Sequence, residues 1–421
     1  MEVVQVGSGT LGIRATTPNE RGLEMGQICL ARGRRVRLAG VLFSSLVILS
    51  ACGKSGEARS EQPAQEAPGQ TANQLLSFGL LDANGGWALT SDGLDFSADN
   101  GGSWTSASLP VPVDSIAGIG FRDSADGWVV TFGDGSSSPS AVIYSTSDGG
   151  STWTSSKVVL SLPVGDQTIA AYPTSGVDKA NEWVCISLGT GQPGLPVSNS
   201  VLVKTTDAGS TWHQVGGGQV PLYVNCPMTF SDATTGWAVS GNTAGQFLVS
   251  RDAGASWSPV KLDTSRTQGG ASFSLPTFDG SAGLELATTG TALGGAELDS
   301  FTTNDGGDTW TRSGQFVPPD GAGSQFLIQN VSIVDSAHAF AVLEPHHFVV
   351  TSDGGSSWTE VQPGSTPPPL GLFDFTTSNM GWAYGSGRSL LTTETGGQEW
   401  VDITPSLLPG QSEPPQPKAS A

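Results

Sequence analysis

Basic residues are scarce in this sequence. Its 421 residues include 18 Lys and Arg against 38 Asp and Glu, which gives a formal net charge of −20 at pH 7. Nucleic-acid binding depends on Lys and Arg side chains that neutralise phosphates. The composition therefore argues against a nucleic-acid partner. A soluble, aggregation-resistant surface explains the acidic charge more simply than a specific basic partner does.

Metal ligands are scarce as well. The chain has four His and four Cys, and His346 and His347 are the only adjacent histidines. Neighbouring residues on a strand point to opposite faces and do not bind one ion together without distortion. We assign "PHHF" to a surface loop and expect no metal or other cofactor.

Residues 1–52 contain a short apolar run, of about 14 residues, where a membrane-spanning helix needs roughly 20. Four arginines precede the run, and Leu49-Ser50-Ala51-Cys52 follows it. This order is typical of a secretion signal, and its end resembles the lipobox of bacterial lipoproteins, which implies cleavage before Cys52 and lipidation of its thiol. A short buried segment with an incidental Cys is the alternative. Met25 is a better start than Met1.

Two polar segments flank the central part of the chain. Residues 53–74 and 406–421 contain Pro, Gln and Ser without an apolar period. Such segments are typically disordered. The first is predicted to be a tether and the second a tail. After cleavage the chain keeps 12 Lys and Arg and 35 Asp and Glu, a net charge of about −23.

Between them, Ser/Thr-x-Asp-x-Gly-x-Ser/Thr-Trp recurs, with successive tryptophans 42 to 59 residues apart. That period matches one four-stranded propeller blade. A Gly-Trp-Ala type motif precedes five of the copies, at Trp87, Trp128, Trp183, Trp237 and Trp382, so the repeat contains all 12 tryptophans. The six full copies are Asp99 with Trp104, Asp148 with Trp153, Asp207 with Trp212, Asp252 with Trp257, Asp305 with Trp310 and Asp353 with Trp358; a seventh keeps Gly397 and Trp400 but has Thr395 for the Asp.

Each unit is predicted to contain four strands, with the box as the turn between strands three and four. The box Asp accepts hydrogen bonds from backbone N–H groups of the turn, and the Gly adopts a conformation closed to other residues. The Trp begins strand four and packs beside the turn. These residues are therefore structural. How the ring closes is left open by the sequence.

These copies resemble the Asp-box, or bacterial neuraminidase, repeat. Together with segments such as "MTFSDATTGWAV", they are similar to the photosystem II stability and assembly factor family of seven-bladed propellers. The resemblance covers residues 75–405 and implies an all-β, seven-bladed propeller, which we expect to be monomeric. For photosynthetic members of that family it implies a role in photosystem II assembly.

Enzymes that contain the same repeat need residues that this sequence lacks. By family resemblance, a sialidase needs an arginine cluster, a Tyr-Glu pair and an acid Asp, whereas the predicted propeller has five scattered arginines. Xyloglucan-cleaving enzymes place two carboxylates between two propellers, and this chain has one. No nucleophile motif or phosphate-binding glycine loop is present, so an enzyme is less expected than a binding protein.

Cys185 and Cys226 fall in strand two of the third unit and strand one of the fourth. In an oxidising compartment they either form a disulfide or stay as buried thiols.

Longer connections, at 132–140, 188–200, 289–300 and 314–325, lie between strands two and three or four and one. Since variable loops on rigid scaffolds tend to bind, we predict that this face, opposite the boxes, contacts the partner.

Two functions follow as alternatives. The first is a lipid-anchored, extracytoplasmic propeller that binds a protein and assists the assembly or stability of a membrane complex. The second is a carbohydrate-binding or glycan-hydrolysing protein of the cell envelope.

Overall fold

The computed structural model describes residues 73–133, 139–161, 167–174, 177–189, 199–216, 226–240, 246–263, 271–290, 296–318, 331–343, 347–361, 372–385 and 389–408. All of them lie in one compact unit, Leu38–Ala421. The signal sequence, Cys52 and most of the predicted tether fall outside these ranges. Among the residues described, no helix has the length and hydropathy needed to cross a membrane.

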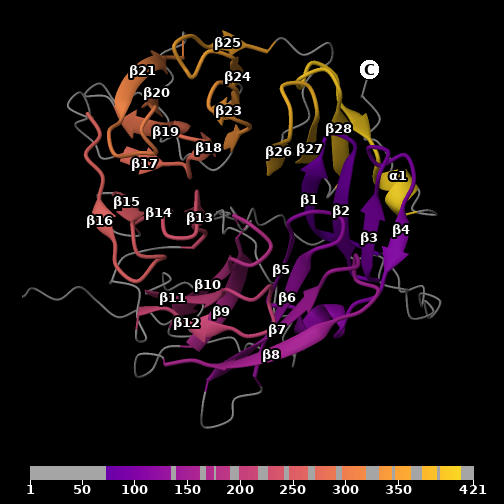
Figure 1. Ribbon diagram of the computed structural model, residues 1–421. Coiled ribbons are helices and arrows are strands. Elements are labelled where there is room, and N and C mark those ends of the chain that lie inside the picture. The colour runs from indigo at the N-terminus through magenta and orange to yellow at the C-terminus, as the bar shows by residue number, and fades with distance from the viewer. Residues whose placement is uncertain are drawn as a thin grey trace, which may run out of the picture. The chain divides into compact units, whose positions relative to one another are not determined.

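Seven antiparallel sheets follow one another along the chain (Figure 1). Six of them are meanders whose neighbouring strands are hydrogen-bonded in sequence order, and the remaining one, the fifth, differs in its first strand. The predicted all-β, seven-bladed propeller is therefore confirmed.

The first four blades are built from these strands: β1 Leu75–Asp82, β2 Gly85–Thr90, β3 Leu94–Ser97 and β4 Thr105–Ala107; β5 Gly118–Phe121, β6 Gly127–Phe132, β7 Ser140–Thr146 and β8 Thr154–Val159; β9 Gln167–Pro173, β10 Glu182–Gly189, β11 Asn199–Thr205 and β12 His213–Gln214; β13 Thr229–Phe230, β14 Gly236–Val239, β15 Phe247–Ser250 and β16 Ser258–Pro259. A 3₁₀ turn, η1 (Val113–Ser115), connects the first blade to the second.

The last three blades contain β17 Ala271–Phe273, β18 Thr277–Asp279, β19 Ala282–Gly290, β20 Ala296–Thr303 and β21 Thr311–Phe316; β22 Val331–Ile333, β23 Ala339–Leu343, β24 His347–Thr351 and β25 Thr359–Glu360; β26 Phe373–Phe375, β27 Gly381–Tyr384, β28 Leu390–Thr393 and β29 Val401–Asp402. In the fifth blade, β17 and β18 both pair with β19, so strand one is split in two. Pro276 lies in the gap, and its missing N–H cannot join a ladder.

The Phe-x-Asp-x-x-x-Gly-Trp motif has a packing explanation. A Cβ on Gly236 would lie 2.5 Å from the Phe230 ring of the same blade, so only glycine leaves room for that ring. The Phe230 ring in turn stacks on Trp183 of the preceding blade, with centroids 3.8 Å apart. Phe375 repeats this arrangement, lying against Gly381 and stacking at 3.7 Å on Phe340. The motif thus joins consecutive blades by aromatic stacking.

Packing and hydrogen bonds, rather than strand exchange, close the ring between the seventh blade and the first. The first sheet contains only β1 to β4 and the last only β26 to β29. After β29 the chain forms α1 (Thr404–Leu407), and Leu407 and Leu408 are buried with Leu75 and Trp382. Ser406 accepts a hydrogen bond from Trp104 Nε1 (3.1 Å).

This closure corrects two predicted boundaries. Ser406, Leu407 and Leu408 belong to the fold rather than to a tail, because the two leucines are buried in a cluster with residues of the first and seventh blades. At the other end, the Ser91 N–H donates to the Gln74 carbonyl (2.9 Å) and the Gln74 N–H donates to Ser91 Oγ (3.0 Å), so Gln74 is part of the first blade rather than of the tether.

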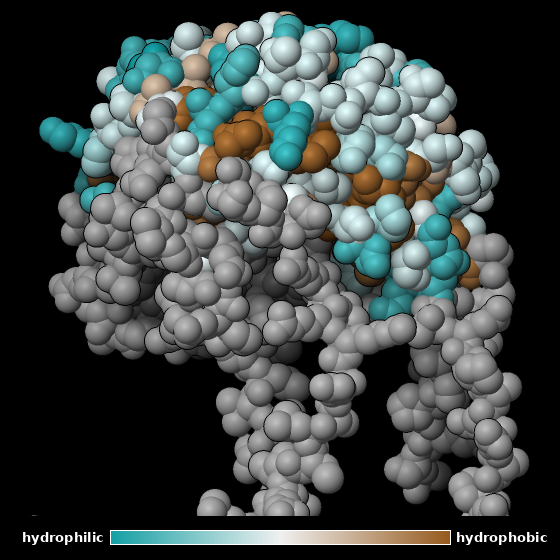
Figure 2. All heavy atoms as spheres, turned by 90° about the horizontal axis from the view of Figure 1, so that it is seen from below, coloured by the Kyte–Doolittle hydropathy of each residue, from teal (hydrophilic) through white to brown (hydrophobic). Residues whose placement is uncertain are grey.

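The described surface in Figure 2 is mainly hydrophilic or of intermediate hydropathy, and hydrophobic residues form separate patches on it. The exposed large apolar side chains are scattered along the chain, as Val159 on β8 and Val401 on β29 show. Scattered exposure of this kind is normal for a soluble surface.

Candidate functional site

Six Asp-box turns share one hydrogen-bond arrangement. The Asp carboxylate accepts a backbone N–H (2.8–2.9 Å) and a hydroxyl (2.5–2.7 Å) from the residue four positions later. A second hydroxyl, two positions before the Asp, donates to the carboxylate at 2.7–2.9 Å and accepts the N–H of the box Gly. The pairs are Asp99 with Ser103, Asp148 with Thr152, Asp207 with Thr211, Asp252 with Ser256, Asp305 with Thr309 and Asp353 with Ser357.

These bonds favour the ionised carboxylate. The hydroxyl of Thr211, followed by its N–H, lowers the pKa of Asp207 to about 2. The pKa values of the other five box Asp residues are lowered by the same kind of contacts. A carboxyl group whose pKa is lowered by folding stabilises the protein at pH values above its pKa in the unfolded chain. This stabilisation is lost as the pH falls through the folded pKa. Each box carboxylate is therefore engaged within its own turn.

The seventh box reaches the same geometry without a carboxylate. Thr395 Oγ1 accepts the N–H of Glu399 at 2.9 Å, and the Gly397 N–H donates to Thr393 Oγ1 at 3.0 Å. The hydroxyl thus takes over one of the contacts that Asp makes elsewhere.

Box tryptophans contact the preceding blade as well as their own turn. Trp153 Nε1 donates to the Ser108 carbonyl of the first blade (2.9 Å), and Trp358 Nε1 donates to Ser300 Oγ of the fifth (3.0 Å). The boxes are therefore part of the contacts between blades.

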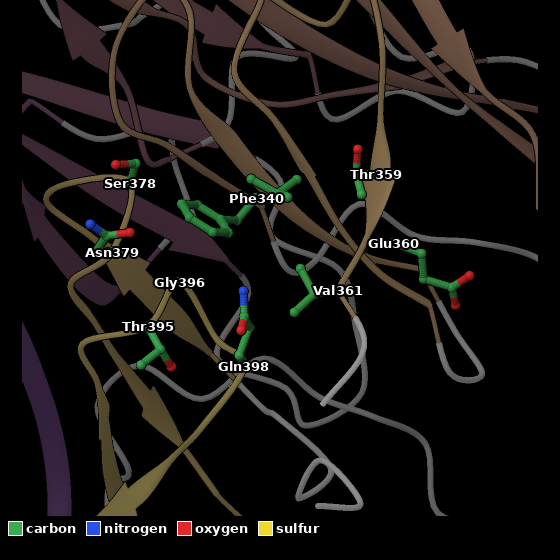
Figure 3. A pocket seen from close by; sticks show the side chains of 10 residues that line it. Phe340, Thr359, Glu360, Val361, Ser378, Asn379, Thr395, Gly396 and Gln398 are labelled. Atoms are coloured by element: carbon green, nitrogen blue, oxygen red, sulfur yellow. The ribbon is translucent and has the colours of Figure 1, made fainter. Parts of the chain in front are cut away.

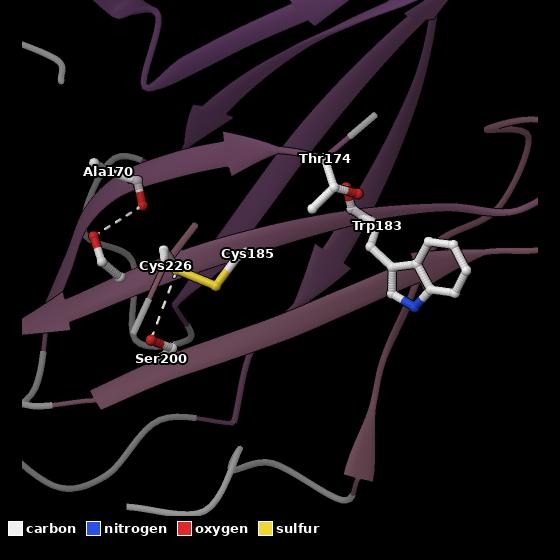
Figure 4. The surroundings of a disulfide bond; sticks show 7 residues. Ala170, Thr174, Trp183, Cys185, Ser200 and Cys226 are labelled. Atoms are coloured by element: carbon white, nitrogen blue, oxygen red, sulfur yellow. Dashed lines mark hydrogen bonds between the residues drawn. A yellow bond between two sulfur atoms is a disulfide. The ribbon is translucent and has the colours of Figure 1, made fainter. Parts of the chain in front are cut away.

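A disulfide joins the third blade to the fourth (Figure 4). Cys185 is fully buried on β10, as expected from the sequence. Cys226 was expected in strand one of the fourth blade, but β13 begins only at Thr229. The chain runs to Cys226 before it enters the sheet, and Cys226 Sγ lies 3.7 Å from Ser200 Oγ.

The assignment of "PHHF" to a surface loop is wrong for His347. This residue begins β24, is 8% exposed, and its Nδ1 lies 2.9 Å from Glu360 Oε1. Its pairing with Leu343 makes it part of the sheet, next to Phe316 of the fifth blade. His346 lies outside the described residues. Within the described ranges, no three His, Cys, Asp or Glu side chains cluster as metal ligands would.

Two open grooves occur on the described surface. The first, which we call the blade-6/7 groove, has a volume of about 370 Å³ and lies between β23 to β25 and the turns of the seventh blade (Figure 3). Its base contains Phe340, Val350 and Val361, and Asn379 and Gln398 are among its polar lining residues.

The second, the blade-1 groove, has a volume of about 420 Å³ and is lined by Ser91, Asp92, Gly93, Ala107, Leu109, Val111, Pro112, Val113 and Asp114. It is formed by the turn between β2 and β3 and by the connection after β4. Both segments belong to the face opposite the Asp boxes. Most of the other long connections predicted for that face lie outside the described residues.

An ion cluster lies between the second and third blades. The Arg122 guanidinium contacts Asp126, lies 3.2 Å from Asp123 Oδ2 and reaches Glu182 Oε1 at 3.6 Å. Glu182 is 1% exposed, so its charge depends on nearby compensation. Lys179 also pairs with Asp126, at 3.2 Å, but is 61% exposed.

We expect Arg122→Met to lower the free energy of unfolding by about 3 kcal/mol, because it removes the cation beside a buried carboxylate. Lys179→Met removes an exposed partner of the same cluster and should cost less than about 1 kcal/mol. Urea titrations of both variants measure the difference. Equal losses in the two variants would contradict this role for Arg122.

Two carboxyl groups have raised pKa values. Burial raises the pKa of Glu285, a fully buried residue on β19 whose Oε2 accepts a hydrogen bond from Ser274 Oγ (3.2 Å). Burial also raises the pKa of Asp374, which accepts a bond from Ser332 Oγ (3.1 Å). Asp374 lies on strand one of its blade, where nearby protein atoms raise its pKa although part of its side chain contacts solvent. The sequence analysis singled out neither residue, although each interrupts an apolar strand.

We expect Glu285→Gln to change the pH dependence of stability. The native Glu285 stays protonated above the unfolded pKa, so the wild-type free energy of unfolding falls as the pH rises through the window from about 4.5 to the raised native pKa. The slope from this group is about 1.4 kcal/mol per pH unit, and Gln removes it.

Urea titrations at pH 4, 6 and 8 test this expectation. The variant should approach the wild type at pH 4 and exceed it at pH 8. Glu297→Gln, on β20 of the same sheet, makes the same substitution at a residue that is not fully buried and is the matched control. Parallel curves for wild type and Glu285→Gln would show that Glu285 does not titrate as its burial requires.

No protein-family model matches this sequence, and no curated protein matches it. Among solved structures, YCF48 from Cyanidioschyzon merolae is 16% identical, with a TM-score of 0.48 over 78% of this chain and 97% of that chain. YCF48 bound to D1 peptide is 16% identical, with a TM-score of 0.49 over 77% and 92%. Prolyl oligopeptidase B from Galerina marginata is 12% identical, with a TM-score of 0.50 over 79% of this chain and half of that one. At these identities the likeness is one of fold.

Proposed function

We propose that this chain is a membrane-anchored, extracytoplasmic propeller that binds a protein partner through the face opposite its Asp boxes and assists the assembly or stability of a membrane complex. The observation that carries the proposal is the blade-1 groove, whose apolar base opens on that face. Binding sites commonly lie on loops held by a rigid scaffold.

On the Asp-box face, polar groups are already used in contacts within the propeller. Its carboxylates accept hydrogen bonds within their own turns, and several of its tryptophans contact the preceding blade. A partner that used these groups would compete with the contacts that hold the blades together. The opposite face carries its groove without that conflict.

The membrane part of the proposal is supported by the sequence. A lipid on Cys52, followed by the tether, would hold the propeller close to a membrane surface. One acyl chain gives only weak membrane binding, and stable anchoring takes a second signal, so we propose that Cys52 carries more than one acyl chain.

The test is co-purification. The lipidated protein, tagged near Ala421, is recovered from gently solubilised membranes, and proteins present in near-equal amount are identified by mass spectrometry. We expect one membrane complex. Its cross-links should fall on the face that carries the blade-1 groove rather than on the Asp-box turns. Recovery of no partner, or cross-links confined to the boxes, would argue against the proposal.

A carbohydrate ligand is the second candidate, favoured by the blade-6/7 groove. Side-chain amides such as those of Asn379 and Gln398 line it, and such groups bind sugar hydroxyls. Envelope glycans applied to the wild type and to Gln398→Ala would test it: loss of binding in the variant supports a glycan site, and no binding to either removes it.

A further inference from the structure

The blade-1 groove is held in place by the local structure on both sides. On one side, Thr90 Oγ1 accepts the N–H groups of Asp92 and Gly93, each at 3.2 Å, and fixes the turn between β2 and β3. On the other, η1 follows Pro112, whose carbonyl accepts the N–H of Ser115 at 3.0 Å. The groove therefore exists before a ligand arrives, which lowers the cost of binding.

Its base is apolar. Leu109, Val111 and Val113 are half-buried and pack on the buried cluster that contains Leu89 and Leu94. Their outer surfaces line the groove. A ligand side chain placed there would bury apolar surface on both partners.

The rim of the groove is acidic, and no basic residue of the same blade neutralises its charge. Residues 73–117 contain five Asp and no Lys, Arg or His. Three of these Asp residues accept hydrogen bonds from their own blade: Asp82 from the N–H of Asn84, Asp95 from Ser106 Oγ, and Asp99 within its box. The other two, Asp92 and Asp114, are exposed on the groove. Asp114 accepts a long bond from the adjacent Ser115 Oγ (3.5 Å), and among the described residues neither Asp forms an ion pair.

We propose that the blade-1 groove binds an extended segment of a partner protein in which apolar residues alternate with Lys or Arg. Alternate side chains of an extended chain point to opposite sides, so the apolar ones enter the base while cations near the rim approach Asp92 and Asp114. Charge complementarity of this kind sets specificity and association rate more than affinity. This inference rests on the proposed function and names the chemistry of its partner.

The experiment uses a short, fluorescently labelled peptide of alternating Leu and Lys, a matched peptide with Glu in place of Lys, and fluorescence anisotropy with the purified full chain. We expect the Lys peptide to bind and the Glu peptide not to bind. Raising the ionic strength to about 0.5 M should weaken binding, because exposed charges are screened.

Variants then locate the site. Asp92→Asn and Asp114→Asn should each weaken binding of the Lys peptide by up to about fivefold, the range of an exposed ion pair. Asp95→Asn makes the same change of net charge in the same blade away from the groove, and should leave binding unchanged. Replacing both Asp92 and Asp114 by Lys should reverse the preference in favour of the Glu peptide.

Equal weakening in all three Asn variants would show attraction by net charge alone and overturn the inference. Two other results would also overturn the inference: sedimentation that shows a second copy closing the groove, and peptide binding that appears only after residues 53–72 are removed. If the co-purified membrane complex is still recovered by the variant with Lys at both positions, the proposed function stands and the inference fails. If no complex is recovered while the peptide binds as expected, the groove is a site whose partner is not a membrane complex.

Discussion

Gly307→Ala is expected to lower the free energy of unfolding by about 4 kcal/mol, the sum of a left-handed backbone and an overpacked core. Gly307 lies in the fifth box, at the position that is Gly in all seven copies of the box, and its φ is +85°. A Cβ there would lie 2.2 Å from a ring carbon of Trp237 on the preceding blade. The variant must therefore both strain its backbone and displace a fully buried tryptophan.

Gly306→Ala is the matched control. Its φ is +73°, but a Cβ would meet no atom within 4 Å. Ala208 and Ala253 occupy the same box position in other blades at φ +57° and +61°. We expect this variant to lose only about 1 kcal/mol, the cost of the left-handed conformation. Chemical denaturation of both variants measures the two contributions. Equal losses of unfolding free energy would show that the close approach of Trp237 is not the reason that Gly is needed at position 307.

Removing the Cys185–Cys226 disulfide is expected to have an effect of similar size. The bond closes a loop with a sequence separation of 41 residues, and the chain-entropy model assigns such a loop about 4 kcal/mol. Cys185→Ala combined with Cys226→Ala should therefore unfold at a markedly lower urea concentration. Because the bond joins two blades, we expect the loss to include their shared interface.

The wild type under reducing conditions provides the comparison for that double variant. Both samples lack the cross-link and should unfold together, apart from the small difference in side-chain volume. Thiol titration of the unfolded, unreduced wild type should detect neither Cys185 nor Cys226. Labelling of Cys185 or Cys226 in that titration, located by peptide mass spectrometry, or a double variant as stable as the oxidised wild type, would contradict the expected role of the bond.

The repeat predicted the fold because its chemistry is local. A hydroxyl, an Asp two residues later and a Gly two residues after that satisfy one another within a single turn, so the box can be recognised without knowledge of its neighbours. Even the seventh copy follows this rule, because Thr395 accepts the same N–H that Asp accepts elsewhere. Seven such turns at blade-length intervals are compatible with few folds.

Predictions that depended on contacts between distant segments were less accurate. The tail was placed after residue 405 because its composition is polar, yet Leu407 and Leu408 are buried against the first blade. The segment "PHHF" is predicted to be a surface loop, yet His347 begins β24 beside Glu360. In both cases the deciding partner is remote in sequence, or lies on another strand.

The sequence by itself determined the number of blades, the position of each box turn and the acidic character of the chain, because these follow from local hydrogen bonds and composition. Only the tertiary structure decided which glycines face a neighbouring ring, how the first and last blades meet, and that Glu285 is buried without a countercharge on its strand. It also brought Asp92 and Asp114 to one apolar groove. Those properties depend on which surfaces the ring places together, and spacing along the chain does not carry that information.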